Sequence, residues 1–528
     1  MQRIFRLFFA AALIVSVSAA FSEDEPQAPR VFTVAANPRQ FSLDPLHAFT
    51  SFESQFYTAI YEGLVVNNPF TLEPIPGIAA RWELSGDDRI YRFYLRADAL
   101  YSDGKPVRAQ DFVDSWMRMI DPASKAEYSF LFDPIAGARA YRNGTAKDPK
   151  KVGIRAVSDK ILEVELEKPA GYFLKVLCHI SFLPIYPAYL KNSGWGNAKS
   201  VIGDGPYIIT KRTEAEIVLD KNMLYWDEKS VALDRIVIKF MSDAAEATDA
   251  FLAGSVDWSE IYPTAKVQDS GKVVVMPLFS TSYFYFVCDK PPWNDWRVRR
   301  GLALLVPWEQ IRSSETYLFP DSRLVPTIPS YPEVKGIVGQ KTDEALKLLA
   351  EAGFAGGKGL PPLQVKVGAS GEDEAKKMAE VWEKAIGLKT EIRTISPEDD
   401  YFAEIKKADF TLGDSTWIGD YADPLTFLQL WTTDSNLNDA RFSDSEYDAA
   451  VTDALVIQDT AGRYKKLAQA EEMLLSKAAI LPLSHAPAVH LIDLDRVDGW
   501  YPNILDIHPF KFIGFKEQKA PSGVAMAK

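Results

Sequence analysis

The sequence predicts a mixed α/β protein built from two or three lobes. Its 528 residues exceed the roughly 250–300 that one hydrophobic core organises. Apolar residues make up 47% of the chain and charged residues 25%, which is typical of a folded globular protein. Segments with the alternation of strands and segments with the spacing of amphipathic helices follow one another throughout. This mixture favours α/β or α+β lobes over an all-α or all-β fold.

The clearest strand signals are three short alternating segments. They cover residues 91–95, 161–166 and 235–240. Helices are expected over 109–120, over 342–352 with a stop at Gly353, and over 464–475, because their apolar residues recur at helical spacing. Both element types therefore occur in every part of the chain.

The first 22 residues are organised like a secretory signal. Arg3 and Arg6 precede an almost unbroken apolar run over 7–17, which is too short to span a bilayer comfortably, and small residues follow it. No cysteine lies near the expected cleavage site, so no lipid-attachment motif is present. The alternative is an uncleaved anchor. Since no later segment has 18 consecutive apolar residues, we expect a soluble, exported protein with a loose tail over 517–528.

The charge of the chain argues against nucleic-acid binding. The formal net charge is −13, and removal of Arg3 and Arg6 with the signal would make it −15. An acidic surface repels phosphates, so no nucleic-acid partner is expected. Cys178 and Cys288 are too few for a disulfide framework, and they are expected either to pair or to remain two separate thiols.

A search for catalytic and metal-binding motifs finds little. The closest histidine pair, His485 and His490, is five residues apart and lacks the glutamate of a zincin motif, so no metal site is predicted. There is no GxSxG elbow, and the glycine-rich run 353–359 has the wrong spacing for a phosphate loop and is expected to be the turn after a helix. No cofactor is predicted. Acidic residues cluster at Asp409, Asp414, Asp420 and Asp423, which leaves an exported hydrolase as a minor alternative.

An ordered set of motifs resembles the family 5 extracellular solute-binding proteins, the oligopeptide and dipeptide binders of ABC importers. The motifs are Leu43-Asp44-Pro45, Tyr61–Leu64, Pro76–Trp82, the block from Tyr91 to Trp116, Gly203–Tyr207, Tyr225-Trp226, Ala253–Asp257, Lys290–Arg299, Glu344–Phe354, Trp417–Pro424 and the helix expected from Tyr464 to Leu475. They run from about residue 31 to 516, which is nearly the whole mature chain.

The resemblance implies a bilobal clam of the periplasmic-binding-protein type with an additional inserted lobe. The first lobe would combine residues 31–63, 190–277 and 487–516, the inserted lobe would span 64–189, and the second ligand-clamping lobe, the second jaw, would span 278–486. It also implies a periplasmic, monomeric binding protein and not an enzyme. Such a protein would capture short peptides and deliver them to a membrane permease.

The resemblance also implies a ligand site. Asp420 matches the family position that takes the N-terminal ammonium of a peptide, a role that suits a carboxylate because charge-assisted hydrogen bonds are strong. Trp417 would form a pocket wall, and Tyr128 and Tyr283 would line the cleft. The alternatives are a turn-forming aspartate for Asp420 and plain core packing for the three aromatic residues.

One position departs from the family pattern. Some oligopeptide binders have an arginine six residues before the ammonium-binding aspartate, where this chain has Asp414. The peptide carboxylate would then be held elsewhere or not at all. The alternatives are a non-peptide ligand, such as a metal chelate, a sugar or a cationic solute, and a chaperone-like holder of unfolded chains.

Overall fold

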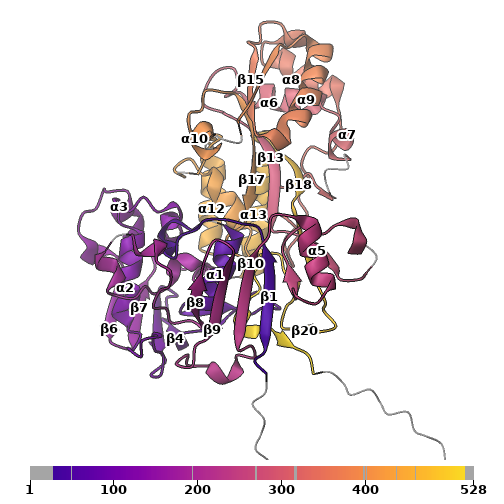
Figure 1. The fold of residues 1–528 in the computed structure, drawn as a ribbon. Coiled ribbons are helices and arrows are strands. Elements are labelled where there is room, and N and C mark those ends of the chain that lie inside the picture. Colours follow the sequence, from indigo (N-terminus) through magenta and orange to yellow (C-terminus); the bar gives the residue numbers. More distant parts are fainter. Residues whose placement is uncertain are drawn as a thin grey trace, which may run out of the picture.

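Three β-sheets organise the chain, and each carries its own helices. The computed structural model describes residues 28–517 except 49, 193, 268–269, 314–317, 397–398, 400, 436 and 458. The predicted signal over 1–22 and all but Glu517 of the predicted tail lie outside the described residues. Figure 1 shows two bodies side by side at the base and a third, drawn largely in orange, above them.

The first sheet has seven strands and forms the body that contains the start of the chain. Its order is β12 (Val273–Pro277), β19 (Pro487–Ile492), β11 (Trp258–Ser259), β1 (Val31–Ala36), β10 (Arg235–Phe240), β9 (Glu216–Lys221) and β8 (Tyr207–Arg212). β1 is parallel to both of its neighbours, and the outer pairs are antiparallel. A small pair, β20 (Val497–Asp498) and β21 (Gly514–Phe515), lies nearby.

Helices α1 (Ser51–Ile60) and α5 (Ala244–Leu252) pack on β8 and β11 of this sheet. A capping box starts α1, in which the Glu53 N–H donates to Thr50 Oγ1 at 3.2 Å and the Thr50 N–H donates to the Glu53 carboxylate at 3.0 Å. Phe52 and Phe56 lie on the buried face of α1 and pack into the core of this body. The opposite face of α1 therefore stays available to the space between the lobes.

The second sheet has four antiparallel strands and forms the body on the left of Figure 1. Its order is β4 (Ala79–Leu84), β5 (Ile90–Leu95), β7 (Ile161–Glu165) and β6 (Ile154–Ser158), and the hairpin of β2 (Val65–Asn67) and β3 (Pro74–Pro76) precedes it. Helix α2 (Ala109–Met119) packs across β6 and β7. The short elements η2 (Glu127–Phe132), α3 (Ala138–Arg142) and α4 (Phe173–Val176) face the body above.

The third sheet has six strands and supports the remaining helices. Its order is β14 (Phe319–Pro320), β18 (Ile480–His485), β13 (Ser280–Phe286), β17 (Leu412–Ile418), β15 (Leu363–Val367) and β16 (Thr390–Thr394). The helices are α6 (Trp296–Leu305), α7 (Trp308–Arg312), α8 (Thr342–Glu351), α9 (Glu372–Ile386), α10 (Tyr401–Lys406), α11 (Leu425–Leu428), α12 (Ser445–Leu455) and α13 (Thr460–Ser476). Helices α6 and α8 approach closely at Gly301, where an added Cβ would lie 2.8 Å from Leu349 Cγ.

Two extended connections join the first and third sheets. They lead from β12 to β13 and from β18 to β19, and they bond to each other: the Leu278 N–H donates to the Ala486 oxygen at 2.8 Å, and the Ala486 N–H donates to Ser280 Oγ at 3.0 Å. Such a ribbon of a few residues at element ends is the kind of hinge that closes two lobes around a ligand.

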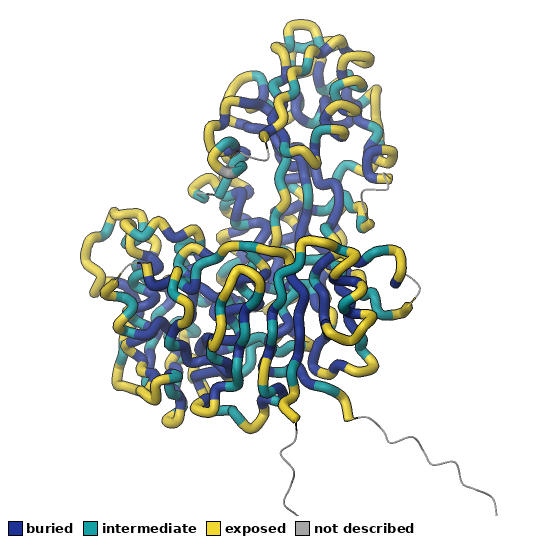
Figure 2. Tube along the Cα trace, viewed as in Figure 1, coloured by how far each residue is buried: buried dark blue, intermediate teal, exposed yellow. Residues whose placement is uncertain are grey.

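The strongest element predictions are confirmed. The strand over 235–240 is β10, the helix over 342–352 is α8, and the helix over 464–475 lies within α13. Gly353 adopts φ +94°, as a helix stop requires. Figure 2 shows a buried interior in each of the three bodies. We propose that the chain divides into the first lobe, the inserted lobe and the second jaw at 63/64, 189/190, 277/278 and 486/487.

The cysteines do not pair. Cys178 lies in the inserted lobe and Cys288 in the second jaw, and both thiols are free. Burial raises the pKa of the Cys288 thiol to about 11. Within the described part of the chain, no helix is long and apolar enough to cross a membrane.

Candidate ligand-binding cavity

A cavity of about 120 Å³ lies where the three lobes meet, and we call it the interlobe cavity. The first lobe contributes α1 and residues between 505 and 512, the inserted lobe contributes Tyr128, Lys175 and residues 177–180, and the second jaw contributes residues 418–421. The lining mixes hydroxyl, ionisable and apolar groups. Such a lining suits a small ligand that has both a charged and an apolar part.

Asp420 is the acidic group of the second jaw in this cavity. It follows β17, and its N–H donates to Thr426 Oγ1 at 3.0 Å while the Thr426 hydroxyl donates to Asp420 Oδ2 at 3.5 Å. Tyr128 of the inserted lobe lines the same cavity and favours the ionised form of this carboxylate. Burial nevertheless raises the pKa of Asp420 to about 7, and among the described residues no cationic side chain offsets this effect.

Tyr128 and His179 form a neutral wall beside Asp420. Their ring centroids are 4.5 Å apart, and burial lowers the pKa of His179 to about 3, so its imidazole is uncharged at neutral pH. His179 Nδ1 accepts the Ser181 N–H at 3.2 Å. The wall therefore brings no positive charge of its own to the Asp420 carboxylate.

A buried ion pair braces the turn that carries Asp420. Asp423 is fully buried, and both of its oxygens accept hydrogen bonds from the Arg463 guanidinium on α13, one of them at 2.9 Å. The Leu425 N–H adds a third bond to Asp423 Oδ1 at 3.1 Å. The position of Asp420 is thus set by α11 and α13 rather than by a free loop.

Trp417 and Tyr283 lie on neighbouring strands and not in the lining of the interlobe cavity. Trp417 is half-buried on β17, opposite Thr281. Tyr283 on β13 is buried against Trp431, with ring centroids 5.5 Å apart, and it stands opposite Ser415 of β17. The structure thus brings Asp420 and Tyr128 into one cavity lining and leaves the other two predicted residues outside it. Their role as ligand contacts stays a prediction.

The Asp414 carboxylate already accepts hydrogen bonds within the second jaw. Its Oδ1 accepts the Gly368 N–H at 2.9 Å and the Tyr401 hydroxyl at 3.2 Å. Burial raises the pKa of Asp414. An added Cβ at Gly371 would lie 2.3 Å from Asp414 Oδ2, so this carboxylate fits a space that a glycine provides.

The cavity also contains an ion pair that the sequence did not reveal. Lys511 Nζ lies 3.4 Å from Glu62 Oε1 and 3.0 Å from Asp227 Oδ2, and the Trp226 indole N–H donates to Glu62 Oε2 at 2.5 Å. Glu62 and Lys511 are 449 residues apart in the chain, so no local pattern could have joined them. They place on the first-lobe side of the cavity two opposite charges that already pair with each other.

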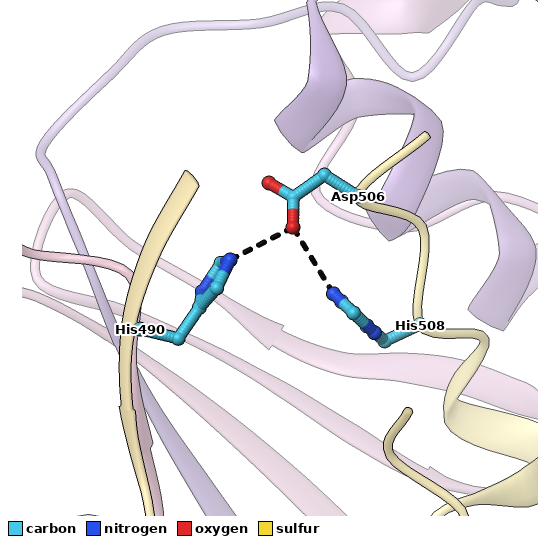
Figure 3. A group of neighbouring side chains, drawn as sticks. All are labelled: His490, Asp506 and His508. Carbon is cyan, nitrogen blue, oxygen red and sulfur yellow. Dashed lines mark hydrogen bonds and ion pairs between the residues drawn. The ribbon is translucent and has the colours of Figure 1, made fainter. Parts of the chain in front are cut away.

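The structure gathers three other ionisable residues outside this cavity, His490, Asp506 and His508 (Figure 3). Asp506 Oδ1 lies 2.7 Å from His490 Nε2 and 3.1 Å from His508 Nε2. The Trp258 indole can only donate, and it donates to His490 Nδ1 at 3.1 Å. His490 Nε2 therefore carries its hydrogen toward Asp506 and offers no lone pair to a metal. His485 is not part of the group, because its Nε2 faces Asp321 Oδ2 at 3.2 Å in the second jaw.

Comparison with known proteins identifies the fold and the family. The family model described as bacterial extracellular solute-binding proteins, family 5 Middle, matches residues 73–439. The periplasmic oligopeptide-binding protein OppA of Escherichia coli is 30% identical over 477 residues, which cover 85% of this chain and 86% of the relative. The probable deoxycholate-binding periplasmic protein YgiS of Escherichia coli is 28% identical over 516 residues, covering 91% and 93%.

A solved structure gives the same result. The murein tripeptide binding protein MppA of Escherichia coli superposes with a TM-score of 0.78 at 27% identity, over 93% of this chain and 99% of that one. This match confirms the predicted multi-lobed α/β binding-protein fold. Since the family model covers more than half of the sequence, the chain belongs to the bacterial extracellular solute-binding proteins of family 5.

Proposed function

We propose that this protein is the substrate-binding subunit of an ABC importer, which captures short peptides between its lobes and delivers them to a membrane permease. Its relatives are binding proteins and not enzymes, which supports a role without turnover. Relatives named as periplasmic support export to the periplasm, where the protein would act as a monomer.

The observation that carries the proposal is the half-buried Asp420 carboxylate at the meeting point of three lobes. Its hydrogen-bond partner is the Thr426 hydroxyl, Tyr128 lines the same cavity, and no described cation offsets the desolvation of the carboxylate. A ligand ammonium would supply the missing positive charge and up to three N–H donors. A peptide with a free N-terminus has this group, whereas neutral sugars do not.

The strand that leads to Asp420 offers a place for the rest of a peptide. Within the described strands, β15 pairs with β17 only at Leu412 and Gly413, so the edge of β17 over 414–418 on that side has no strand partner. An extended ligand can satisfy its backbone groups along such an edge, and side chains of variable type can point to either face. Trp417 lies in this stretch of β17, which supports its proposed role as a pocket wall.

A second candidate is a non-peptide solute. A relative of similar identity is named as a probable deoxycholate-binding protein. In addition, Asp414 stands where some oligopeptide binders have an arginine that can pair with the peptide carboxylate. A ligand without an ammonium would leave the Asp420 carboxylate unpaired. The cavity chemistry therefore favours the peptide.

A ligand screen by thermal unfolding separates the two candidates. The protein is unfolded and refolded to remove carried-over ligand, and its midpoint is then measured with tripeptide pools, with the same pools N-acetylated, and with deoxycholate. We expect stabilisation by the free peptides only, by about 2.7 kcal/mol at a concentration 100 times the Kd. Stabilisation by deoxycholate, with no response to either peptide pool, would replace the peptide with the second candidate.

A further inference from the structure

A second cavity lies directly behind the interlobe cavity, and we call it the rear cavity. It encloses about 740 Å³ between the inserted lobe, over residues 130–145 and 167–176, and the second jaw, over residues 421–455. Tyr421 lines both cavities. The two spaces therefore adjoin at Tyr421.

Three short segments divide their residues between the two cavities. Element η2 gives Tyr128 to the interlobe cavity and Leu131 to the rear cavity, and α4 gives Lys175 to the first and Val176 to the second. The second jaw gives Asp420 to the interlobe cavity and, five residues later, Leu425 to the rear cavity. Both lobes thus contribute to the partition between the two cavities.

The centre of this partition is a stack of two tyrosines. Tyr172 and Tyr421 lie with ring centroids 6.4 Å apart and planes inclined by 16°, and their exposed fractions are 5% and 2%. The Arg463 guanidinium lies 5.6 Å from the Tyr172 ring centroid. Lys175 Nζ donates to the Ala422 oxygen at 3.5 Å beside the stack. The partition is therefore packed from both lobes, and polar contacts hold its rim.

We propose that Tyr421, stacked on Tyr172, is the end wall that makes the site specific for an unsubstituted terminal ammonium. The inference rests on the proposed function, because it assumes that a ligand ammonium binds at Asp420. Tyr421 directly follows Asp420 in the chain, so a substituent on the ligand nitrogen that points away from the peptide would meet the wall. Without the phenol ring, the same substituent would enter the rear cavity.

The probe keeps the positive charge and changes only the size of the nitrogen substituent. Gly-Ala-Ala carries a primary ammonium, and N-benzyl-Gly-Ala-Ala carries a secondary ammonium with the same charge. Since overpacking of a filled site costs about 1–3 kcal/mol, we expect wild-type protein to bind the benzylated peptide up to about 100-fold more weakly, measured by calorimetry. For Tyr421→Ala we expect this difference to shrink to within about 10-fold.

Two further variants test the route of the substituent. Tyr421→Phe keeps the ring and should discriminate as the wild type does. Ala140→Trp, placed in the Tyr421→Ala background, fills part of the rear cavity from the inserted lobe and should restore discrimination. Binding of Gly-Ala-Ala and the thermal midpoint report whether each variant is folded. If Tyr421→Ala does not fold, Tyr421→Leu takes its place, since it removes less buried volume.

The outcomes separate the wall from the proposed function. Wild-type protein that binds neither peptide contradicts the proposed function. Wild-type protein that binds both peptides equally overturns the wall, and so does a folded Tyr421→Ala or Tyr421→Leu variant that binds Gly-Ala-Ala but still rejects the benzylated peptide. Relief of discrimination in Tyr421→Ala, with reversal by Ala140→Trp, supports it.

Discussion

Replacement of Arg463 by methionine is expected to lower the free energy of unfolding by about 3–5 kcal/mol. The Arg463 guanidinium holds both oxygens of Asp423, and the side chains of the two residues are 5% and 0% exposed. Removal of one partner would leave a carboxylate in the protein interior with only the Leu425 N–H to bond it. Urea unfolding, monitored by tryptophan fluorescence, measures the loss.

An exposed arginine provides the control for this prediction. Arg155 pairs with Glu163 at 3.0 Å, but its side chain is 51% exposed, so Arg155→Met should cost no more than about 1 kcal/mol. The double variant Asp423→Leu with Arg463→Met removes both charges and should recover much of the stability. Equal losses for Arg463→Met and Arg155→Met would show that the Asp423–Arg463 pair does not brace the Asp420 turn.

Peptide affinity is expected to fall about 50-fold between pH 7 and pH 5. Burial raises the pKa of Asp420 to about 7, so the empty site is increasingly protonated below neutrality and must lose its proton to pair with an ammonium. The ammonium stays charged over this range, and His179, with its pKa lowered to about 3, stays neutral. Calorimetric titrations at half-unit steps of pH measure the slope.

The same pKa predicts a stability effect of opposite sign. A folded-state pKa above the unfolded value of about 3.9 means that the contribution of Asp420 to stability is present below about pH 4 and is lost as pH rises through about 7. Asp420→Asn removes the ionisation and should flatten both profiles. An affinity that is unchanged from pH 7 to pH 5 in the wild type would contradict a protonated empty site.

Local patterns predicted the elements well because they depend on nearby residues. The alternation over 235–240 corresponds to β10, and the spacing over 342–352 together with Gly353 corresponds to α8 and its stop. Asp420 was predicted from the resemblance of the motif around it to the family, and its role as a ligand contact stays a prediction. The number and order of the lobes came from the resemblance and not from periodicity.

The site itself depends on contacts between distant segments. Tyr128 reaches Asp420 only because the inserted lobe meets the second jaw, and Lys511 reaches Glu62 from the far end of the chain. The burial of Tyr283 against Trp431 reflects a sheet that is covered on both faces, which strand alternation does not reveal. The tyrosine stack between the two cavities has no signature in the sequence for the same reason.

The most direct test of ammonium capture by Asp420 is a calorimetric cycle with two proteins and two ligands. Wild-type and Asp420→Asn protein are each titrated with Gly-Ala-Ala and N-acetyl-Gly-Ala-Ala at pH 7.5, with Asp498→Asn as a control at an exposed acid of the first lobe. We predict that acetylation weakens binding to the wild type and the control by about 100-fold or more and hardly affects the already weak binding to Asp420→Asn. An equal loss on acetylation in all three proteins would show that the ammonium is held elsewhere and would contradict the account.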